Sequence, residues 1–241
     1  MNSFKVLSIA LVVCATLFTN CKKEAELLPE NTTEMTAKKK SAAKPDGSVS
    51  SRTVAFTMPS ENEPHEGTWL QWPHQYQYGY SYRNLLSPTW VAMTKELVSG
   101  ENVHVIAYNN SHKNWIISKL NAAGVPLTNV NFKIIQTNDC WVRDNGPIFV
   151  RNTSGQLRIE DWDFNGWGFK APYSKDNLVP SKVGTAINMP VVNLNSEMTV
   201  EGGAFEIDGN GTLMATRSSI LNSNRNPGMT QAEAEEIFET N

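Results

Sequence analysis

The sequence predicts an α/β fold, because segments typical of buried strands alternate with segments typical of helices along most of the chain. Apolar runs at residues 68–72, 103–108 and 130–136 are short enough to be strands, and two helical segments separate them, 88–99 and 111–123. The chain has 241 residues, of which 40% are hydrophobic, and this is enough for one sizeable domain with its own core.

The sequence contains a start signal and a stop signal for the first helix. A serine side chain can accept a hydrogen bond from a free N–H of the first turn, and proline suits the first turn itself, so Ser87 and Pro88 predict the start. Gly100 predicts the end, because glycine adopts the backbone conformation of a helix terminus without strain. The second helix is predicted to end at Gly124 in the same way.

The strand at 68–72 contains two tryptophans and follows an acidic segment. Alternation of apolar and polar residues predicts that Trp69 and Trp72 face the core. In an alternative interpretation, Glu66 and Trp72 line the mouth of a pocket. The local pattern leaves both interpretations open.

The second half of the body contains further strands, turns and helices. Residues 204–216 alternate around a turn of sequence D-G-N-G and predict a β-hairpin. Thr230 and Glu233 form the capping box of a last helix that runs through Thr240. The other expected elements are a turn at 152–155, a strand at 157–163, a helix within 175–189 and a strand at 191–194.

Charge and histidine spacing argue against two classes of partner. The net charge is −3, the lysines concentrate in the N-terminal tail, and no basic stripe interleaved with aromatic residues runs through the body, so no nucleic-acid partner is expected. No Cys/His pattern has metal-site spacing, and we expect neither a metal nor another cofactor. Each histidine is interpreted as a surface residue or as a structural residue with satisfied hydrogen bonds: His65, His74, His104 and His112.

The N-terminal segment has the features of an export signal. Lys5 supplies a positive charge, residues 6–18 are apolar but too few to span a bilayer comfortably, and the run L-F-T-N-C ends at Cys21. This run is similar to a bacterial lipobox, which predicts a lipoprotein signal peptide at residues 1–20 and lipidation of the Cys21 thiol. An uncleaved anchor helix and an ordinary secretory signal are the alternatives. In each case we expect export, and with the lipid the protein is a membrane-anchored lipoprotein of the cell envelope, facing the periplasm or the cell surface.

Residues 21–52 separate this signal from the predicted domain at 53–241. Beyond Cys21 the segment is rich in Lys, Ala, Ser, Thr and Glu and has no aromatic residues, so it cannot bury enough apolar surface to order itself. We therefore predict a disordered tether between membrane and domain. With Cys14 in the signal and Cys21 lipidated, Cys140 is the only thiol of the body, and no intramolecular disulfide is possible.

The most informative stretch is 138–150, N-D-C-W-V-R-D-N-G-P-I-F-V. Charged residues among apolar neighbours must be paired or hydrogen-bonded, because an isolated ion does not survive desolvation. One interpretation is a structural ion pair between Arg143 and a carboxylate beside a turn. The other is a functional role for Asp144, which is favoured because loops that follow strands carry the chemistry of α/β folds.

Two further segments place acidic residues beside glycines. In D-W-D-F-N-G-W-G-F-K, residues 161–170, two tryptophans five positions apart and two glycines suit a loop that closes over a flat ligand, and a core loop with satisfied indoles is equally consistent. Glu201 precedes Gly202 and Gly203, where the backbone can approach a ligand closely. Its carboxylate is therefore expected to point into a cleft.

Five motifs follow one another in the body: M-P-S-E-N-E-P-H-E-G-T-W-L-Q-W-P, D-C-W-V-R-D-N-G-P, D-W-D-F-N-G-W-G, E-G-G-A-F-E-I-D-G-N-G-T-L and L-N-S-N-R-N-P. In this order and spacing they resemble the agmatine deiminase and bacterial Porphyromonas-type peptidylarginine deiminase family, from about Thr57 onward. The resemblance implies an α/β-propeller, or pentein, of ββαβ-type modules around a pseudo-fivefold axis that carries the active site. No strand or capping glycine follows the last helix, so we expect an N-terminal fragment whose pentein is incomplete at the C-terminus.

The resemblance also implies hydrolysis of a guanidinium. In this family a cysteine thiolate attacks the central carbon, ammonia leaves, and water cleaves the covalent intermediate while a histidine transfers protons. Asp144 of W-V-R-D matches the guanidinium-binding aspartate, and Glu201 of E-G-G matches a carboxylate that related enzymes place on the substrate. Trp141 and Trp167 are expected to help wall the pocket. Cys140 does not match the nucleophile.

The family's G-H-x-D motif and its late nucleophilic cysteine are not among the 241 residues. We therefore expect this chain alone to be inactive, whereas the full-length family member deiminates its substrate. Agmatine, converted to N-carbamoylputrescine and ammonia in putrescine biosynthesis, is slightly favoured as substrate over peptidyl arginine. The alternatives are protein citrullination at the cell envelope, a non-catalytic lipoprotein that binds guanidinium ligands, and a surface protein in which these carboxylates and tryptophans are structural.

Overall fold

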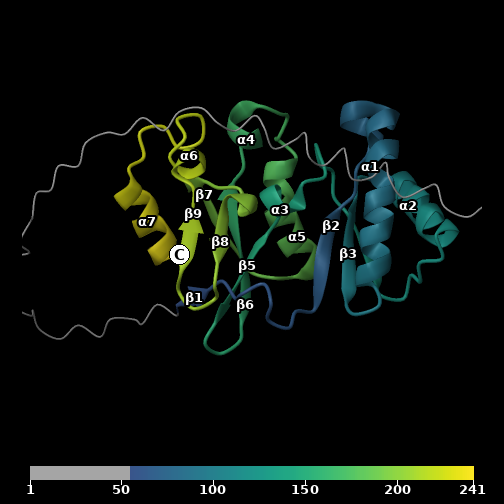
Figure 1. Ribbon diagram of the computed structural model, residues 1–241, viewed down its shortest axis with the longest axis horizontal. Coiled ribbons are helices and arrows are strands. Elements are labelled where there is room, and N and C mark those ends of the chain that lie inside the picture. The colour runs from purple at the N-terminus through teal and green to yellow at the C-terminus, as the bar shows by residue number, and fades with distance from the viewer. Residues whose placement is uncertain (1–54) are drawn as a thin grey trace, which may run out of the picture. The chain divides into compact units, whose positions relative to one another are not determined.

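Two sheets with a helix between them organise residues 55–241, the part of the chain that the computed structural model describes (Figure 1). The predicted signal peptide at 1–20, the lipidation site Cys21 and the tether at 21–52 lie outside the described residues. Within the described part, every helix is too short or too polar to cross a membrane.

The first sheet is parallel, and helices join its strands. β2 (Gly67–Gln71), β3 (Asn102–Ala107) and β4 (Val130–Ile134) lie side by side in that order. Parallel neighbours need a crossover that returns the chain to the starting edge. α1 (Gln75–Leu97) and α2 (Asn110–Ala122) supply the crossovers and cover one face of the sheet (Figure 1). The predicted α/β alternation is confirmed here.

Alternation along β3 divides its side chains between two cores. Val103, Val105 and Ala107 face α1 and α2. Ile106, one residue out of step, belongs to the core on the opposite side of the sheet. Successive side chains of a strand point to opposite faces, so this one strand stabilises both cores.

The two tryptophans around β2 are both packed against a core. Trp72, one residue beyond β2, is 1% exposed among the side chains of α1 and α2. Trp69 packs on the other face, where its ring stacks on His104 at 4.7 Å between centroids. The core interpretation is therefore right, and the alternative in which Glu66 and Trp72 line a pocket mouth is wrong because Trp72 is buried.

The second sheet is mixed. β1 (Phe56–Thr57), β5 (Ile148–Asn152), β6 (Leu157–Asp163) and β7 (Val191–Thr199) follow one another across it. β5 and β6 form an antiparallel hairpin, whereas β6 and β7 are parallel and are joined through α5 (Val179–Ile187). β5, β6, α5 and β7 therefore make one ββαβ module.

α5 lies between the two sheets (Figure 1). Val179 and Val183 are fully buried, and they share one core with Ile159 of β6 and Ile106 of β3. Burying each such side chain stabilises the fold by about 1.5–3 kcal/mol. The helix thus joins the two sheets through a common apolar layer.

The last elements along the chain are β8 (Phe205–Ile207), β9 (Leu213–Ala215), α6 (Arg217–Ile220) and α7 (Gln231–Thr240). β8 and β9 form the predicted hairpin. The predicted capping box is also present: Glu233 N donates to Thr230 Oγ1 at 3.3 Å, and Thr230 N donates to Glu233 Oε2 at 2.7 Å. α7 packs against β7 through a third apolar core.

Four short helical segments occupy the connections between strands: α3 (Val142–Asn145), α4 (Gly166–Phe169), η1 (Asp176–Leu178) and η2 (Gly202–Ala204). Of these, α3, α4 and η2 are the first helical segments after β4, β6 and β7. The carboxyl ends of parallel strands are where α/β folds place binding sites. The topology therefore puts Asp144, Trp167 and Glu201 in loops suited to form one site.

The predicted start of the first helix at Ser87 is wrong. α1 begins at Gln75, where Tyr76 N donates a hydrogen bond to His74 Nδ1 at 3.2 Å. Ser87 lies inside the helix, and its hydroxyl donates to Arg83 O at 2.5 Å. A serine in a helix interior commonly satisfies its hydroxyl in this way.

The longer helix follows from an apolar stripe that continues on both sides of Pro88: Tyr82, Leu86, Trp90, Met93 and Leu97. Spacings of three or four residues place these side chains on one helix face. Their burial against the first sheet compensates for the backbone N–H that Pro88 lacks. Ser-Pro is thus an interior feature here and not a start signal.

Candidate active site

Asp144 lies in α3 and is partly buried beneath two other segments. Near its carboxylate lie two N–H groups that lower the pKa of Asp144, one from the side chain of Trp167 in α4 and one from the backbone of Gly203 in η2. Glu201, the residue before η2, places a second carboxylate close enough to act on Asp144 electrostatically. Three segments that are distant in sequence therefore converge on one acidic side chain.

The surroundings of Asp144 shift its ionisation in both directions. Burial raises the pKa of Asp144 above its ordinary value, and the negative charge of Glu201 raises it further. The N–H groups of Trp167 and Gly203 and the charge of Arg143 lower the pKa in part. A cation bound beside Asp144 would favour its ionised form, because opposite charges stabilise each other in a partly desolvated site.

The two glycines after Glu201 let η2 approach α3. A Cβ atom at Gly203 would lie 2.3 Å from Asp144 Oδ1, and one at Gly202 would lie 2.4 Å from Arg143 O. Both separations are far below contact distance. The E-G-G motif therefore needs glycines because its backbone crowds the Asp144 carboxylate.

Glu201 is only 3% exposed and is paired with a cation of the chain itself. Arg225 Nε donates to Glu201 Oε1 at 2.6 Å, and Ser219 Oγ donates to Oε2 at 3.4 Å. A charge-assisted hydrogen bond as short as the one from Arg225 is strong. Glu201 is thus part of a buried ion pair, and its contact with a substrate stays a prediction.

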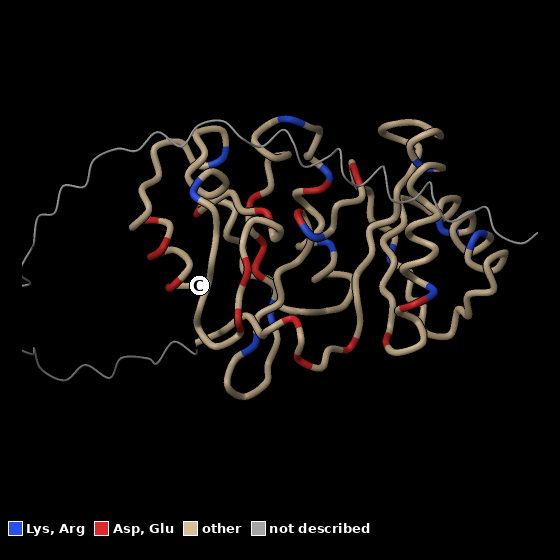
Figure 2. Tube along the Cα trace, in the orientation of Figure 1, with Lys and Arg blue, Asp and Glu red and all other residues tan. Residues whose placement is uncertain are grey.

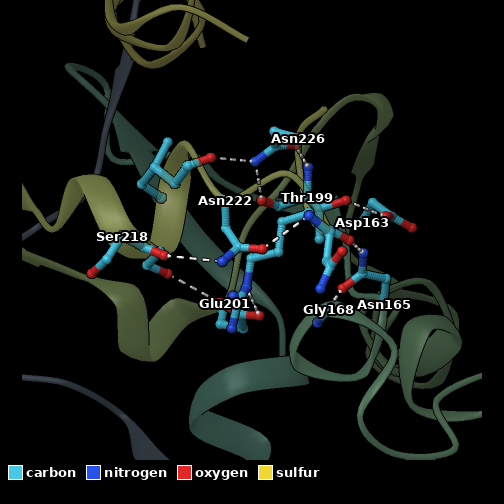
Figure 3. Close-up of polar contacts among 12 residues, drawn as sticks. Asp163, Asn165, Gly168, Thr199, Glu201, Ser218, Asn222 and Asn226 are labelled. Atoms are coloured by element: carbon cyan, nitrogen blue, oxygen red, sulfur yellow. Dashed lines mark hydrogen bonds and ion pairs between the residues drawn. The ribbon is translucent and has the colours of Figure 1, made fainter. Parts of the chain in front are cut away.

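Arg225 belongs to a polar loop, residues 221–227, that asparagine side chains hold to the sheet (Figure 3). Thr199 N donates to Asn226 Oδ1 at 2.8 Å, and Asn226 Nδ2 donates to Thr199 O at 2.9 Å. Thr199 Oγ1 in turn donates to Asp163 Oδ2 at 2.6 Å. The Asn226 amide therefore pairs with the end of β7 as a neighbouring strand would, and this fixes the position of Glu201 two residues later.

The two tryptophans of residues 161–170 have different environments. Trp162 lies in β6, where it is 6% exposed and packs against Phe238 of α7, with 5.8 Å between ring centroids. Trp167 lies in α4, and its indole N–H is near Asp144, whose pKa it lowers. The core interpretation is right for Trp162, whereas Trp167 is part of the candidate site.

Trp141 is the residue immediately before α3 and is 44% exposed. Its ring packs edge-on against Trp90 of α1, with 6.4 Å between centroids. The structure thus brings Asp144, Glu201 and Trp167 together. The predicted contact of Trp141 with a substrate stays a prediction.

Cys140 is buried and is unsuited to nucleophilic attack. Its side chain is 2% exposed, and its Sγ lies 3.5 Å from the Tyr82 hydroxyl. Burial strongly raises the pKa of the Cys140 thiol, so the reactive thiolate is not formed near neutral pH. This agrees with the mismatch between Cys140 and the nucleophile of the family.

A buried acid holds the backbone that leads to Asp144. Asp176 accepts hydrogen bonds from Asn138 N at 2.8 Å, from Asp139 N at 3.1 Å and from Gln71 Nε2 at 3.2 Å. Burial raises the pKa of Asp176 to about 7, although these donors oppose the shift. Asp176 therefore fixes the start of the 138–150 stretch.

The structural ion pair considered for Arg143 is formed with a more distant residue. Arg143 Nη1 lies 2.5 Å from Glu61 Oε1, and both side chains are exposed. Lys and Arg are dispersed along the described chain among acidic positions (Figure 2). Exposed pairs of this kind contribute about 0–1 kcal/mol.

The four histidines are structural or surface residues, but His104 Nδ1 and His112 Nε2 are buried without a hydrogen-bond partner among the described residues, so the predicted satisfaction of their hydrogen bonds is incomplete. His65 pairs with Glu101, His104 pairs with Glu66, His74 contacts Thr137 and His112 contacts Tyr108 and Asn109. Burial lowers the pKa of His74 and of His112 to about 4, so both are neutral near pH 7. Among residues 55–241, no group of three or more His, Cys, Asp or Glu side chains is arranged to hold a metal ion.

The layered sheets, the ββαβ module and the acidic site at the strand ends define a pentein-type domain. The chain belongs to the Porphyromonas-type peptidyl-arginine deiminase family, whose family model matches residues 57–241. Among solved structures, it resembles the agmatine deiminase of Enterococcus faecalis with a TM-score of 0.67 and 28% identity, over 76% of this chain and 49% of that one.

Curated relatives agree with this assignment. An agmatine deiminase of Pseudomonas aeruginosa is 35% identical over 194 residues, which are 76% of this chain and 50% of the relative. An agmatine deiminase of Pseudomonas fluorescens is 31% identical over 195 residues, which are 79% of this chain and 51% of the relative. The chain thus spans about half the length of the curated relatives that it matches.

Arg225, Asn226 and Asn165 were not predicted as parts of the site. L-N-S-N-R-N-P is one of the five motifs that carry the family resemblance, but its residues have no role assigned from the sequence. The sequence feature that could have identified this loop is the density of asparagines beside a proline, because asparagine side chains often bind backbone groups in loops. An arginine among them is then a candidate partner for a buried acid.

Replacing Arg225 by Ala should lower the free energy of unfolding by about 3–5 kcal/mol, because the charge of Glu201 is then buried without a partner. Chemical denaturation measures this change. Arg151→Ala is the control, since it removes an exposed pair with Glu63 and should cost at most about 1 kcal/mol. The double variant R225A/E201Q should regain much of the loss. A double variant as unstable as R225A would contradict this explanation.

Asp176 should make the protein less stable as pH rises from about 4 to about 7. Its folded-state pKa is raised from 3.8 to about 7, so in this window the folded protein keeps a proton that the unfolded chain has released. Asp176→Asn has no such proton to lose. Its stability relative to the wild type should therefore rise across the window by an amount on the order of 2–4 kcal/mol. Denaturation at several pH values tests this, and a constant difference between the two proteins would refute it.

Proposed function

We propose that this chain carries the guanidinium-binding part of a deiminase that hydrolyses a C–N bond of its substrate. The observation that carries the proposal is the pair of acidic side chains, Asp144 and Glu201, which share one partly desolvated site with Trp167. A guanidinium is a planar cation with several N–H donors, and carboxylates are its best acceptors. Membership of the deiminase family supports the same chemistry.

Asp144 is the acid that is free to accept a substrate cation. The charge of Glu201 is opposed by Arg225 at 2.6 Å, and Arg143 is paired with Glu61. Among the described residues, Asp144 has no ion-pair partner within contact distance. A guanidinium bound at this site would interact directly with the negative charge of Asp144. Glu201 would add to the negative potential.

Deimination needs more than these groups. The reaction consumes water and converts the guanidinium to a urea with release of ammonia, and in the family a thiolate forms the covalent intermediate. Cys140 is a buried thiol with a raised pKa and does not supply that thiolate. We therefore propose that residues 55–241 bind and orient the guanidinium and that other groups carry out the covalent step.

Agmatine is the favoured substrate, with N-carbamoylputrescine and ammonia as products. The curated relatives at 35% and 31% identity are named agmatine deiminases, whereas the matching family model is named for peptidyl arginine. The second candidate is peptidyl arginine, which the proposed export and lipid anchor at Cys21 would make accessible at the cell envelope. The two substrates share the guanidinium and differ in what is attached to it.

Replacing Asp144 by Asn should weaken agmatine binding by at least about tenfold, because the amide keeps the shape but loses the charge. Isothermal titration calorimetry measures the affinity, and Glu206→Gln, which removes an exposed acid, is the control. In the wild type, binding should weaken as pH falls through the raised pKa of Asp144. An arginine peptide titrated in parallel distinguishes the two substrates. Equal affinity in D144N and the wild type would contradict the proposal.

A polypeptide of these 241 residues should bind agmatine without releasing ammonia, because its one body cysteine is buried. An enzyme-coupled ammonia assay at micromolar protein concentration checks this. The matched variant is Cys140→Ser, which should behave as the wild type in both binding and turnover. Release of ammonia that disappears in C140S would show that the buried thiol does act as the nucleophile.

A further inference from the structure

Residues 166–169 form one turn of left-handed helix. The φ angles of Gly166, Trp167, Gly168 and Phe169 are 69°, 59°, 79° and 65°. Within the turn, Phe169 N donates to Asn165 O at 2.9 Å. A left-handed turn is costly for residues with a side chain, because Cβ then crowds the following carbonyl oxygen. Glycine relieves two positions, and the strain at Trp167 and Phe169 must be held by the surroundings.

Asn165 holds the turn from two sides (Figure 3). Gly168 N donates to Asn165 Oδ1 at 2.9 Å, and Asn165 Nδ2 donates to Asn224 O at 2.8 Å. The side chain is 4% exposed, so water does not replace these partners readily. Only an amide offers an acceptor and a donor at this length, since aspartate lacks the donor and alanine lacks both.

The neighbouring backbone leaves little space for another conformation. A Cβ atom at Gly166 would lie 2.3 Å from Ala171 O, and one at Gly168 would lie 3.0 Å from the Cβ of Asn224. The turn is therefore enclosed by the residues that follow it and by the 221–227 loop. The same loop supplies Arg225 to Glu201, so it supports both sides of the site.

The turn directs Trp167 toward Asp144. The indole packs perpendicular to the buried ring of Phe164, with 5.1 Å between centroids, and its N–H lies near the Asp144 carboxylate, whose pKa it lowers. The direction in which a side chain leaves the backbone depends on φ and ψ. A right-handed conformation at Trp167 would aim the indole elsewhere and leave the carboxylate without this donor.

We propose that Asn165 is a positioning residue of the guanidinium site: it holds the left-handed turn and thereby keeps the Trp167 indole beside the Asp144 carboxylate. The inference rests on the proposed function, because it assigns Asn165 to the same site. Asn165 touches neither Asp144 nor a substrate. Its effect is transmitted through the backbone of the turn.

The test compares three variants of the 241-residue chain. Asn165→Ala removes both side-chain hydrogen bonds, and Asn165→Asp keeps the acceptor for Gly168 but loses the donor to Asn224. Asn152→Ala is the matched control, because Asn152 Oδ1 accepts from Ser154 N at 3.0 Å in the turn at the opposite end of β6. All three remove hydrogen bonds from a buried asparagine in a turn.

The first readout needs no ligand. The indole ¹H–¹⁵N resonance of Trp167 should shift with pH in the wild type as Asp144 titrates, and it should do so in Asn152→Ala. In Asn165→Ala this dependence should disappear, with an intermediate response in Asn165→Asp. A Trp167 resonance that still titrates as in the wild type in Asn165→Ala would overturn the inference.

The second readout is agmatine affinity by calorimetry as a function of pH. Asn165→Ala should bind about tenfold more weakly, because the indole N–H beside the charged carboxylate is no longer held in place. The acid limb of its binding curve should move to higher pH, since the Trp167 N–H lowers the pKa of Asp144. Wild-type protein that does not bind agmatine would overturn the proposed function, and unchanged affinity in Asn165→Ala would overturn the inference.

Discussion

The placement of two acidic side chains, Asp144 and Glu201, in one partly desolvated site is the constraint on which the rest of the site depends. In a partly desolvated place, two like charges are tolerated only when each has compensating partners. Arg225 compensates Glu201, and N–H donors from Trp167 and Gly203 compensate Asp144. Because these partners come from separate loops, the site exists only when several strands are in place.

The loops are in turn fixed by polar side chains that act as substitutes for backbone. Asn226 pairs with Thr199 as a strand would, Asn165 bridges Gly168 and Asn224, and Asp176 accepts from the backbone before Cys140. Buried loops without such partners would leave backbone groups unsatisfied. The many asparagines of the motifs are thus explained by the need to hold irregular backbone close to charged side chains.

Most strands and the acidic residues of the candidate site could be proposed from the sequence, because their signals are local. Alternation found the hairpin at 204–216, and the clustering of acids with Trp and Gly found Asp144 and Glu201. The start of α1 could not be placed from Ser87, since Ser-Pro is a local signal and the apolar stripe across it matters only once the sheet is present. Arg225 escaped prediction because its partner, Glu201, lies 24 residues away.

The left-handed turn could not be predicted for a different reason. Trp167 and Phe169 are bulky residues that disfavour positive φ, so local propensity argues against the conformation that they adopt. Only contacts formed by the folded chain, above all those of Asn165, make this conformation the stable one. Local preference and tertiary structure conflict here, and such conflicts tend to lie at functional sites.

α5 has a consequence for how the domain unfolds. Val179 and Val183 form a single apolar layer with Ile106 of the first sheet and Ile159 of the second. If either sheet opened by itself, the remaining one would keep a helix with half of its apolar surface in water. The two sheets therefore belong to one cooperative unit, although the chain builds them one after the other.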